Sequence, residues 1–238
     1  MKKSIGVLLL SFAVMLLIAS PSFSLTYDVI QLTSGNGYHN NPQINANGQV
    51  VWWSEQQQFV APRDVFFYDG ANTVQLANNT SWTPFPMINA SGKVVWFGSD
   101  GTDTEIFLYD GTNIIQLTNN TYNDTYPEIN DNGQVVWYGY PNGTAEIFLY
   151  DGVNTVQLTT NTYNDLLPKI NNNGQIVWHG YPYEYPYGSA ADIFLYDGAN
   201  IIQLTNTSNI HEIYPRINNN GQVIWERWDG TDAELFLY

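Results

Sequence analysis

The sequence predicts an all-β fold: a five-bladed β-propeller with four antiparallel strands in each blade. Three observations predict it. Four short motifs recur in a fixed order with a spacing of 41 to 47 residues, which is the period of a propeller blade. The apolar runs within each repeat lack polar alternation. The chain also begins with one part of the repeat and ends with the other three.

The first strand of each repeat carries Pro-x-Ile-Asn, and the second carries an apolar pair followed by tryptophan. An Asn-x-Asn-Gly turn or a near relative joins them, and Asn and Gly tolerate the positive φ of a tight hairpin. The prolines are Pro42, Pro86, Pro127, Pro168 and Pro215. The tryptophans are Trp52, Trp96, Trp137, Trp178 and Trp225. Their repetition at one place per blade predicts a structural core between blades.

The third strand of each repeat begins with an acidic residue and continues as an apolar run that ends in tyrosine. These runs are 64–68, 105–109, 146–150, 192–196 and 234–238. Asp-Gly-x-Asn follows the first four as a second turn, and the fourth strand carries x-x-Gln-Leu. The glutamines are Gln31, Gln75, Gln116, Gln157 and Gln203. Each repeat therefore reads as four short strands joined by turns.

The strands are predicted to be buried on both faces. Runs such as Val135-Val136-Trp137 do not alternate apolar with polar residues, as a strand with one wet face would. Blades stacked around an axis bury both faces of an antiparallel sheet, whereas a two-layer sandwich leaves one face polar. The pattern therefore favours a propeller.

The two ends of the repeat array predict how the propeller closes. A lone fourth strand, residues 28–33, opens the array, and a third strand ends it at Tyr238. We expect this N-terminal strand to complete the C-terminal blade, because a closed ring has no unpaired edge. Completion of the ring by another chain is the alternative.

Residues 1–24 read as a secretory signal peptide. Lys2 and Lys3 precede an apolar run over 5–19, and small residues stand at Ser22 and Ser24. The run is shorter than the roughly 20 residues of a membrane-spanning helix. We expect cleavage after Ser24, a single domain over 25–238, and a protein that is secreted, periplasmic or at the cell surface.

The composition excludes some partners. Without Lys2 and Lys3 the chain has five basic and 22 acidic side chains, a formal net charge of −17. Such a surface repels nucleic acid and anionic membranes. It suits cations, basic partners or neutral glycans, although solubility alone explains it. We expect a monomer with no membrane insertion after signal cleavage, held by packing and strand pairing because the chain has no cysteine.

The repeat resembles that of a known family. Gln-Leu-Thr, Asp-x-x-Pro, Asn-Gly, an apolar strand and Glu-Ile-Phe-Leu-Tyr-Asp follow in the order of the WD40-like repeat of TolB-type propellers. The resemblance covers nearly all of residues 25–238. Asn-x-Asn-Gly replaces the usual Ser-Pro-Asp-Gly turn, and those propellers more often have six blades. The resemblance implies an interaction platform, a cell-surface module or, less often, part of a peptidase or polysaccharide lyase.

A candidate metal site follows from the position three residues before each proline. It holds His39, Thr83, Asp124, Asp165 and Glu212, and the innermost strands would bring these residues to the channel mouth. His39, Asp124, Asp165 and Glu212 could share a calcium ion, because hard cations prefer several oxygen ligands. The alternative is that the acidic groups accept hydrogen bonds from the loop backbone. No other cofactor is expected.

A candidate aromatic binding face follows from the loops between the second and third strands. The fourth repeat carries Tyr181, Tyr183, Tyr185 and Tyr187 after His179, and Trp53, Trp82 and Trp228 belong to other loops of the same face. Rigid amphipathic rings suit a sugar or a partner protein. The alternative is a loop that folds on its neighbour without binding anything.

The sequence lacks the usual catalytic motifs: there is no cysteine, no Gly-x-Ser-x-Gly and no His-Glu-x-x-His. We therefore expect an exported, non-catalytic module that binds a glycan or a protein. One alternative is a polysaccharide lyase or hydrolase that uses His39, His211 and the acidic rim. The other is a purely structural cell-surface module.

Overall fold

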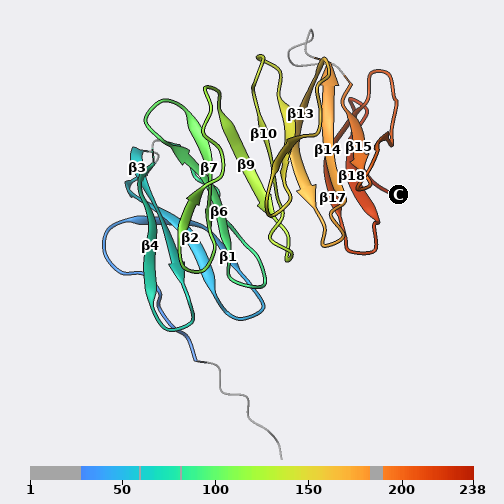
Figure 1. Cartoon of the computed structure of the whole chain (residues 1–238). Helices are drawn as coiled ribbons and strands as arrows, with labels where there is room; N and C mark the ends of the chain where they lie inside the picture. The colour runs from blue at the N-terminus through green and yellow to red at the C-terminus, as the bar shows by residue number, and fades with distance from the viewer. Residues whose placement is uncertain (1–27, 59, 81, 183–189) are drawn as a thin grey trace, which may run out of the picture. The chain divides into compact units, whose positions relative to one another are not determined.

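The computed structural model describes residues 28–58, 60–80, 82–182 and 190–238. The chain divides into two units, residues 1–31 and 32–238. The predicted signal peptide, residues 1–24, lies outside the described residues. The second unit contains five antiparallel sheets that follow one another in chain order (Figure 1).

Each sheet is built from consecutive strands. The first contains β1 (Tyr38–Ile44), β2 (Val50–Gln57), β3 (Val60–Tyr68) and β4 (Thr73–Thr80). The second contains β5 (Met87–Ile88), β6 (Val94–Ser99), β7 (Thr104–Tyr109) and β8 (Ile114–Gln116). The third contains β9 (Asp124–Ile129), β10 (Val135–Gly139), β11 (Glu146–Tyr150) and β12 (Thr155–Gln157). The fourth contains β13 (Tyr163–Ile170), β14 (Ile176–Pro182), β15 (Asp192–Tyr196) and β16 (Ile201–Gln203).

The fifth sheet has three strands: β17 (His211–Ile217), β18 (Val223–Trp228) and β19 (Ala233–Leu237). The prediction of five repeated antiparallel sheets in an all-β, propeller-like fold is confirmed. Residues 28–33 contain no strand, so their pairing with the last sheet stays a prediction. No helix within the described ranges could span a membrane.

In the first, third, fourth and fifth sheets, the first strand bulges opposite the repeated tryptophan. In the second sheet β5 begins only at Met87, after Phe85 and Pro86. In the third sheet Thr125 pairs with Tyr138 and Glu128 with Val136, so two residues, Tyr126 and Pro127, face Trp137 alone. Proline is tolerated at such a bulge because it has no N–H to donate to the ladder. The residue before each proline has a φ between 37° and 55° in all five repeats. This conformation is unfavourable for bulky side chains, and it recurs at Asn41, Phe85, Tyr126, Leu167 and Tyr214.

The core lies between successive sheets. Trp137 packs in one cluster with Val95 and Phe97 of the preceding sheet. Trp178 packs in the next cluster with Val136 and Ile147. All five repeated tryptophans are buried, and each stacks on a phenylalanine of its own third strand at 5.7 to 6.0 Å. Burial of both faces explains why the strands lack polar alternation.

A ladder of asparagine side chains links the sheets where the first strand ends. The amide of Asn45 donates to the backbone carbonyl oxygen of Asn89 at 3.0 Å, and that of Asn89 to Asn130 at 3.0 Å. The bonds from Asn130 to Asn171 and from Asn171 to Asn218 are both 2.9 Å. The Asn of Pro-x-Ile-Asn therefore shapes its own turn and also holds the next sheet.

Candidate functional site

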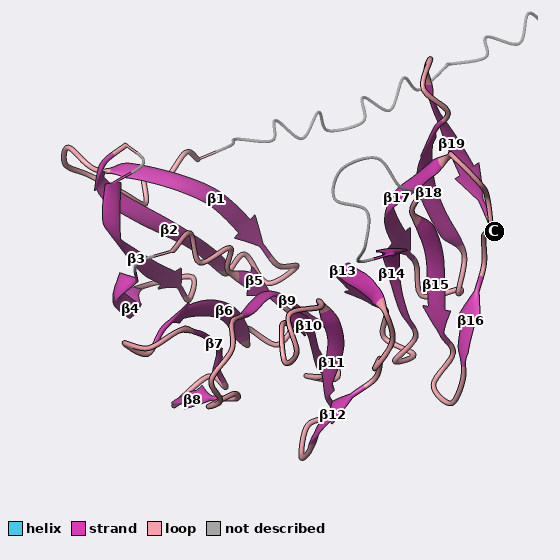
Figure 2. Cartoon of the chain, turned by 90° about the horizontal axis from the view of Figure 1, so that it is seen from above, coloured by secondary structure: helices cyan, strands magenta, loops and turns pink. Residues whose placement is uncertain are grey.

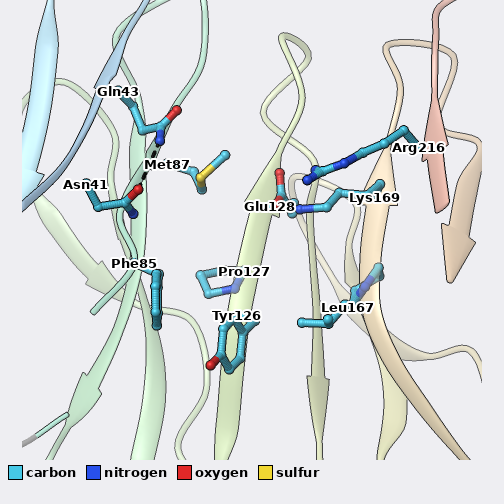
Figure 3. A pocket seen from close by; sticks show the side chains of 11 residues that line it. Asn41, Gln43, Phe85, Met87, Tyr126, Pro127, Glu128, Leu167, Lys169 and Arg216 are labelled. Carbon is cyan, nitrogen blue, oxygen red and sulfur yellow. Dashed lines mark hydrogen bonds and ion pairs between the residues drawn. The ribbon is translucent and has the colours of Figure 1, made fainter. Parts of the chain in front are cut away.

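A central cavity of about 360 Å³ is lined by the residues that flank the bulge prolines (Figure 3). The first strands or their preceding loops contribute from all five sheets. The last strands β8, β12 and β16 lie at the outer side in Figure 2. The lining residues are Asn41, Gln43, Phe85, Met87, Tyr126, Pro127, Glu128, Leu167, Pro168, Lys169 and Arg216. We call this space the central cavity.

The chemistry of the central cavity differs from repeat to repeat. The residue before the proline is polar, aromatic or aliphatic. The residue after it is Gln43, Met87, Glu128, Lys169 or Arg216. Lys169 forms an ion pair with Glu128. Arg216 is exposed, and its side chain makes no ion pair or hydrogen bond with any described residue. Gln43 donates to the Oδ1 atom of Asn41 at 3.3 Å.

A second cavity, of about 530 Å³, lies between the second and third sheets. Six of its lining residues are aromatic: Trp82, Phe85, Phe97, Tyr126, Tyr138 and Tyr140. Thr83, Thr104, Asn123 and Thr125 complete the lining. Phe85 and Tyr126 line both cavities. We call this second space the aromatic pocket.

The rings of the aromatic pocket are held by one another. Tyr126 stacks on Phe85 at 5.1 Å and on Tyr138 at 5.6 Å, and it lies 5.5 Å from Phe97 in the preceding sheet. Tyr140 meets Tyr138 edge to face at 5.9 Å. The positive φ of Tyr126 therefore turns its ring towards the neighbouring sheet. A preorganised aromatic wall results.

Polar groups border this wall. The backbone N–H and the hydroxyl of Thr104 donate to the Oδ1 atom of Asn123 at 3.1 and 3.0 Å, which fixes the amide at the pocket edge. The Asn123 side chain is exposed, so its NH₂ group faces solvent. Burial raises the pKa of Tyr138 and that of Tyr140, and both hydroxyls therefore stay protonated at neutral pH. The pocket combines ring faces with neutral hydrogen-bonding groups.

The acidic residues three before the proline lie buried inside their own sheets. The Oδ1 atom of Asp124 accepts from the indole of Trp137 at 3.0 Å, and its Oδ2 atom accepts from Asn120 at 2.6 Å. Asp165 repeats this arrangement with Trp178 and Asn161, both at 2.9 Å. Burial raises the pKa of Asp124 to about 7, although its two hydrogen bonds oppose the shift.

The residue opposite each of these acidic residues on the neighbouring strand differs from sheet to sheet. Asp124 and Asp165 are paired with glycines, Gly139 and Gly180. Glu212 is fully buried and is paired with Arg227, whose guanidinium donates to the Oε1 atom of Glu212 at 2.6 and 2.8 Å. The hydrogen bonds that these carboxylates accept come from side chains of described residues, whereas the alternative expects donors in the loop backbone.

The four predicted calcium ligands are not gathered into one cluster. Among the described residues, a set of three or more carboxylate or imidazole groups within 4.8 Å of one another occurs at Asp100, Asp103 and Glu105. His39, Asp124, Asp165 and Glu212 form no such set. The shared calcium ion stays a prediction for which the described residues offer no common centre.

The predicted aromatic residues separate into three groups. Trp82 lines the aromatic pocket and is 60% exposed. Trp228 ends β18, 5.6 Å from the His211 ring. Placing Trp53 in a loop is wrong, because β2 continues to Gln57 and buries this residue to 7% exposure under Arg63. Tyr181 is half-buried in β14, whereas Tyr183, Tyr185 and Tyr187 lie outside the described residues.

The three histidines occupy different environments. His39 is exposed at the start of β1, and His211 is half-buried beside Trp228. His179 is buried edge-on to Tyr214 at 5.9 Å, and this burial lowers its pKa to about 4. His179 is therefore neutral at physiological pH.

The sequence prediction identified Trp82 of the aromatic pocket but missed the other five rings of that pocket and the lining of the central cavity. The residues directly beside each proline vary as much as the residue three positions before it, and this variation was the available signal. Their convergence depends on the positive φ before each proline and, in four of the sheets, on the bulge. Periodicity alone does not reveal a bulge.

Comparison with known proteins gives the fold. No protein-family model and no curated protein matches the chain. TolB from Acinetobacter baumannii is similar in structure, with a TM-score of 0.60, 17% identity, and coverage of 86% of this chain and 52% of TolB. A puromycin hydrolase gives a TM-score of 0.62 at 13% identity, over 87% of this chain and 36% of the hydrolase.

A puromycin-hydrolyzing peptidase from Mycobacterium tuberculosis gives a TM-score of 0.60 at 12% identity, over 85% of this chain and 35% of the peptidase. The chain thus spans about half the length of TolB and about a third of the length of these hydrolases. At these identities the likeness concerns the fold. The chain therefore has a repeated-sheet fold similar to the β-propellers of TolB and of these peptidases.

Proposed function

We propose that the protein is an exported, non-catalytic β-propeller that binds a glycan in its aromatic pocket. The proposal rests on one observation: six aromatic side chains surround one cavity of about 530 Å³. Sugar rings present C–H faces that pack on aromatic rings, and their hydroxyls need polar groups at the rim. Trp82, Tyr126 and Tyr140 offer accessible rings, and Asn123 offers an exposed amide.

Replacing Trp82 with alanine tests this proposal. Trp82 is mostly exposed, so Trp82→Ala is expected to leave the melting temperature unchanged. We expect it to weaken glycan binding about 10-fold, which corresponds to about 1.4 kcal/mol. Trp228→Ala is the matched control, because Trp228 is also an exposed tryptophan but lies on the fifth sheet outside the pocket.

A polysaccharide panel with two readouts separates the proposal from its alternatives. The purified protein is assayed for retention on each polysaccharide and for release of reducing or unsaturated ends. Retention without cleavage, lost in Trp82→Ala, supports the binding module. Cleavage supports a lyase or hydrolase. Neither retention nor cleavage supports a structural surface module and overturns the proposal.

We also propose that residues 28–33 form the fourth strand of the fifth sheet. In the second, third and fourth sheets the Gln of the fourth strand pairs with the Phe of the third strand, and the residue before it pairs with the next Leu. This register would pair Gln31 with Phe236 and Ile30 with Leu237. Ile30 is 69% exposed and Leu237 is 67% exposed, so pairing would remove apolar surface from water.

A second contact of the repeat supports this register. The threonine after Gln-Leu donates its hydroxyl to the acidic residue that opens the third strand, as Thr159 does to Glu146 at 2.6 Å. Thr205 and Asp192 make the same bond at 3.2 Å. Thr33 and Glu234 hold these positions in the proposed fifth pair.

Engineered disulfides test the register, because the chain has no cysteine of its own. Ile30→Cys with Leu237→Cys places two thiols directly opposite and is expected to oxidise within one chain. Ile30→Cys with Phe236→Cys is the control, because a shift of one residue places the two side chains on opposite faces. Cross-links between chains would instead support completion by a second copy. Absence of any cross-link would refute the pairing.

A further inference from the structure

We propose that the central cavity binds the carboxylate of an acidic sugar, with Arg216 as the main recognition group. This inference rests on the proposed glycan-binding function and narrows it to glycans that contain uronic acids. It depends on three observations: the positions of the basic side chains, the lack of a partner for the Arg216 guanidinium among the described residues, and the two residues that line both cavities.

Basic side chains are few, and two of them line this one cavity. After residue 24 the chain has five: Arg63, Lys93, Lys169, Arg216 and Arg227. Arg63 pairs with Glu55, and Arg227 pairs with the buried Glu212. Both are therefore committed to their own sheets. Lys169 and Arg216, by contrast, occupy the same repeat position on neighbouring first strands, directly after the bulge proline.

Arg216 is the cation of the central cavity that no described residue neutralises. Lys169 is paired with Glu128, whereas the exposed guanidinium of Arg216 has no ion pair or hydrogen bond with the described residues. Figure 3 shows the Arg216 side chain extending towards the Glu128–Lys169 pair. The three charges sum to +1 inside a strongly acidic protein. An arginine presents two parallel donors, which match the two oxygens of a carboxylate.

The central cavity adjoins the aromatic pocket, because Phe85 and Tyr126 line both. A sugar chain whose rings pack on the aromatic wall can therefore present a neighbouring residue to the central cavity. Asn41 and Gln43 add amide groups there for hydroxyls. The volume of about 360 Å³ lies within the usual range for small-ligand sites.

Matched pairs of oligosaccharides test this inference. Each pair has one linkage and differs at C6: glucose with glucuronate, galactose with galacturonate, and mannose with mannuronate oligomers. Binding is measured by calorimetry at constant ionic strength. We expect the uronate of one pair to bind about 10-fold more tightly than its neutral partner, since one charge-assisted pair contributes roughly this much.

Variants assign the effect to the cavity. Arg216→Gln is expected to reduce uronate affinity to that of the neutral partner and to leave neutral binding unchanged. Glu128→Gln removes the competing anion and is expected to tighten uronate binding. Lys93→Gln is the charge-matched control, because Lys93 lines neither cavity, and it is expected to change neither affinity.

The outcomes separate the two proposals. If neutral oligosaccharides bind in a Trp82-dependent manner but uronates bind no better, the inference is wrong and the proposed function stands. If uronates bind better but Arg216→Gln leaves the ratio unchanged, the central cavity is not the cause and the inference is also wrong. If no oligosaccharide binds, both proposals are overturned.

Discussion

The side-chain amide of Asn130 donates a hydrogen bond of 2.9 Å to the backbone carbonyl oxygen of Asn171, forty-one residues further along the chain. One side chain thereby joins two sheets, beside further hydrogen bonds between the two turns and the ion pair of Glu128 with Lys169. Because a hydrogen bond is directional, this contact fixes the height of one sheet against the next. The same bond recurs from Asn45 through Asn171, so the ladder sets a common position for all five turns.

Removing one rung of the ladder is expected to destabilise the fold. Asn130→Ala leaves the carbonyl oxygen of Asn171 without this donor in a buried place, at a cost of about 1–3 kcal/mol. Urea unfolding followed by tryptophan fluorescence measures it. Asn220→Ala, an exposed turn residue, is the control and is expected to change stability by less than about 0.5 kcal/mol. An equal effect of both changes would contradict a specific role for the ladder.

Substitution of Asn218 offers a second test of ring closure. The amide of Asn218 donates to Gln222 at 2.8 Å within its own turn, and a closed ring would bring the carbonyl oxygen of Asn45 into its reach. If the ring closes as proposed, Asn218→Ala is expected to cost as much as Asn130→Ala. A cost no larger than that of Asn220→Ala would argue against closure.

A methyl group at Gly180 is expected to disrupt the fourth sheet. An added Cβ would lie 2.5 Å from the Oδ1 atom of Asp165 and 3.0 Å from the Phe194 ring. Both neighbours are held by packing and hydrogen bonds, so Gly180→Ala should cost about 1–3 kcal/mol through overpacking. Gly98→Ala is the control, because its Cβ would meet the Thr80 methyl at 3.3 Å. Thermal melts of the two variants compare the effects directly, and equal melting temperatures would refute the clash.

The buried pair of Glu212 and Arg227 is expected to be strongly coupled. Arg227→Met leaves the fully buried Glu212 carboxylate without its cation, which costs about 3–5 kcal/mol. Adding Glu212→Gln to Arg227→Met removes the buried charge and is expected to recover most of the loss. A double-mutant cycle on unfolding free energies measures the coupling. Additive effects of the two changes would show that the pair is not coupled.

The buried carboxyls predict a dependence of stability on pH. Burial raises the pKa of Asp124 to about 7 and that of Asp165 to about 6 in the folded chain, above the ordinary value of about 3.9 for an unfolded aspartate. The folded state therefore binds these protons more tightly than the unfolded state. Their contribution to stability is complete below about pH 4 and is lost as the pH rises through 6 to 7.

Asp124→Asn isolates one of these contributions. The wild type is expected to lose stability between pH 4 and 7, with a slope of up to about 1.4 kcal/mol per pH unit for each group. The Asn variant should have a shallower slope over the same interval, measured by urea unfolding at several pH values. Asp131→Asn, at an exposed turn residue, is the matched Asp-to-Asn control. Parallel curves for the wild type and Asp124→Asn would refute the assignment.

Much of the fold could be predicted from the sequence, because the turn residues of each repeat mark the ends of its strands. The glycine of each Asn-Gly turn, such as Gly133 with a φ of 81°, marks where the first strand ends. The tryptophans mark the core. The bulge could not be predicted directly, because a proline within a strand is compatible with an edge strand as well as with a bulge.

The sites were harder to predict for a physical reason. An aspartate three residues before a proline is compatible with a metal ligand and with an acceptor of hydrogen bonds from the loop backbone, and its surroundings decide its role. For Asp124 those surroundings include Asn120 and Trp137, whose side chains reach it only after folding. Trp82 could be identified from the sequence, whereas Phe97 and Tyr138, which directly follow repeated tryptophans, were not among the candidate residues and line the pocket as well.

The apolar edge of β19 also bears on behaviour at high concentration. Leu235 and Leu237 are exposed along that edge, and a strand edge accepts any extended segment of suitable pattern. If the N-terminal segment of one molecule occupies the edge of another, a reciprocal exchange gives a closed dimer, whereas head-to-tail addition that does not close continues into filaments. Folding at low protein concentration would then favour monomers, and refolding at high protein concentration would favour polymers.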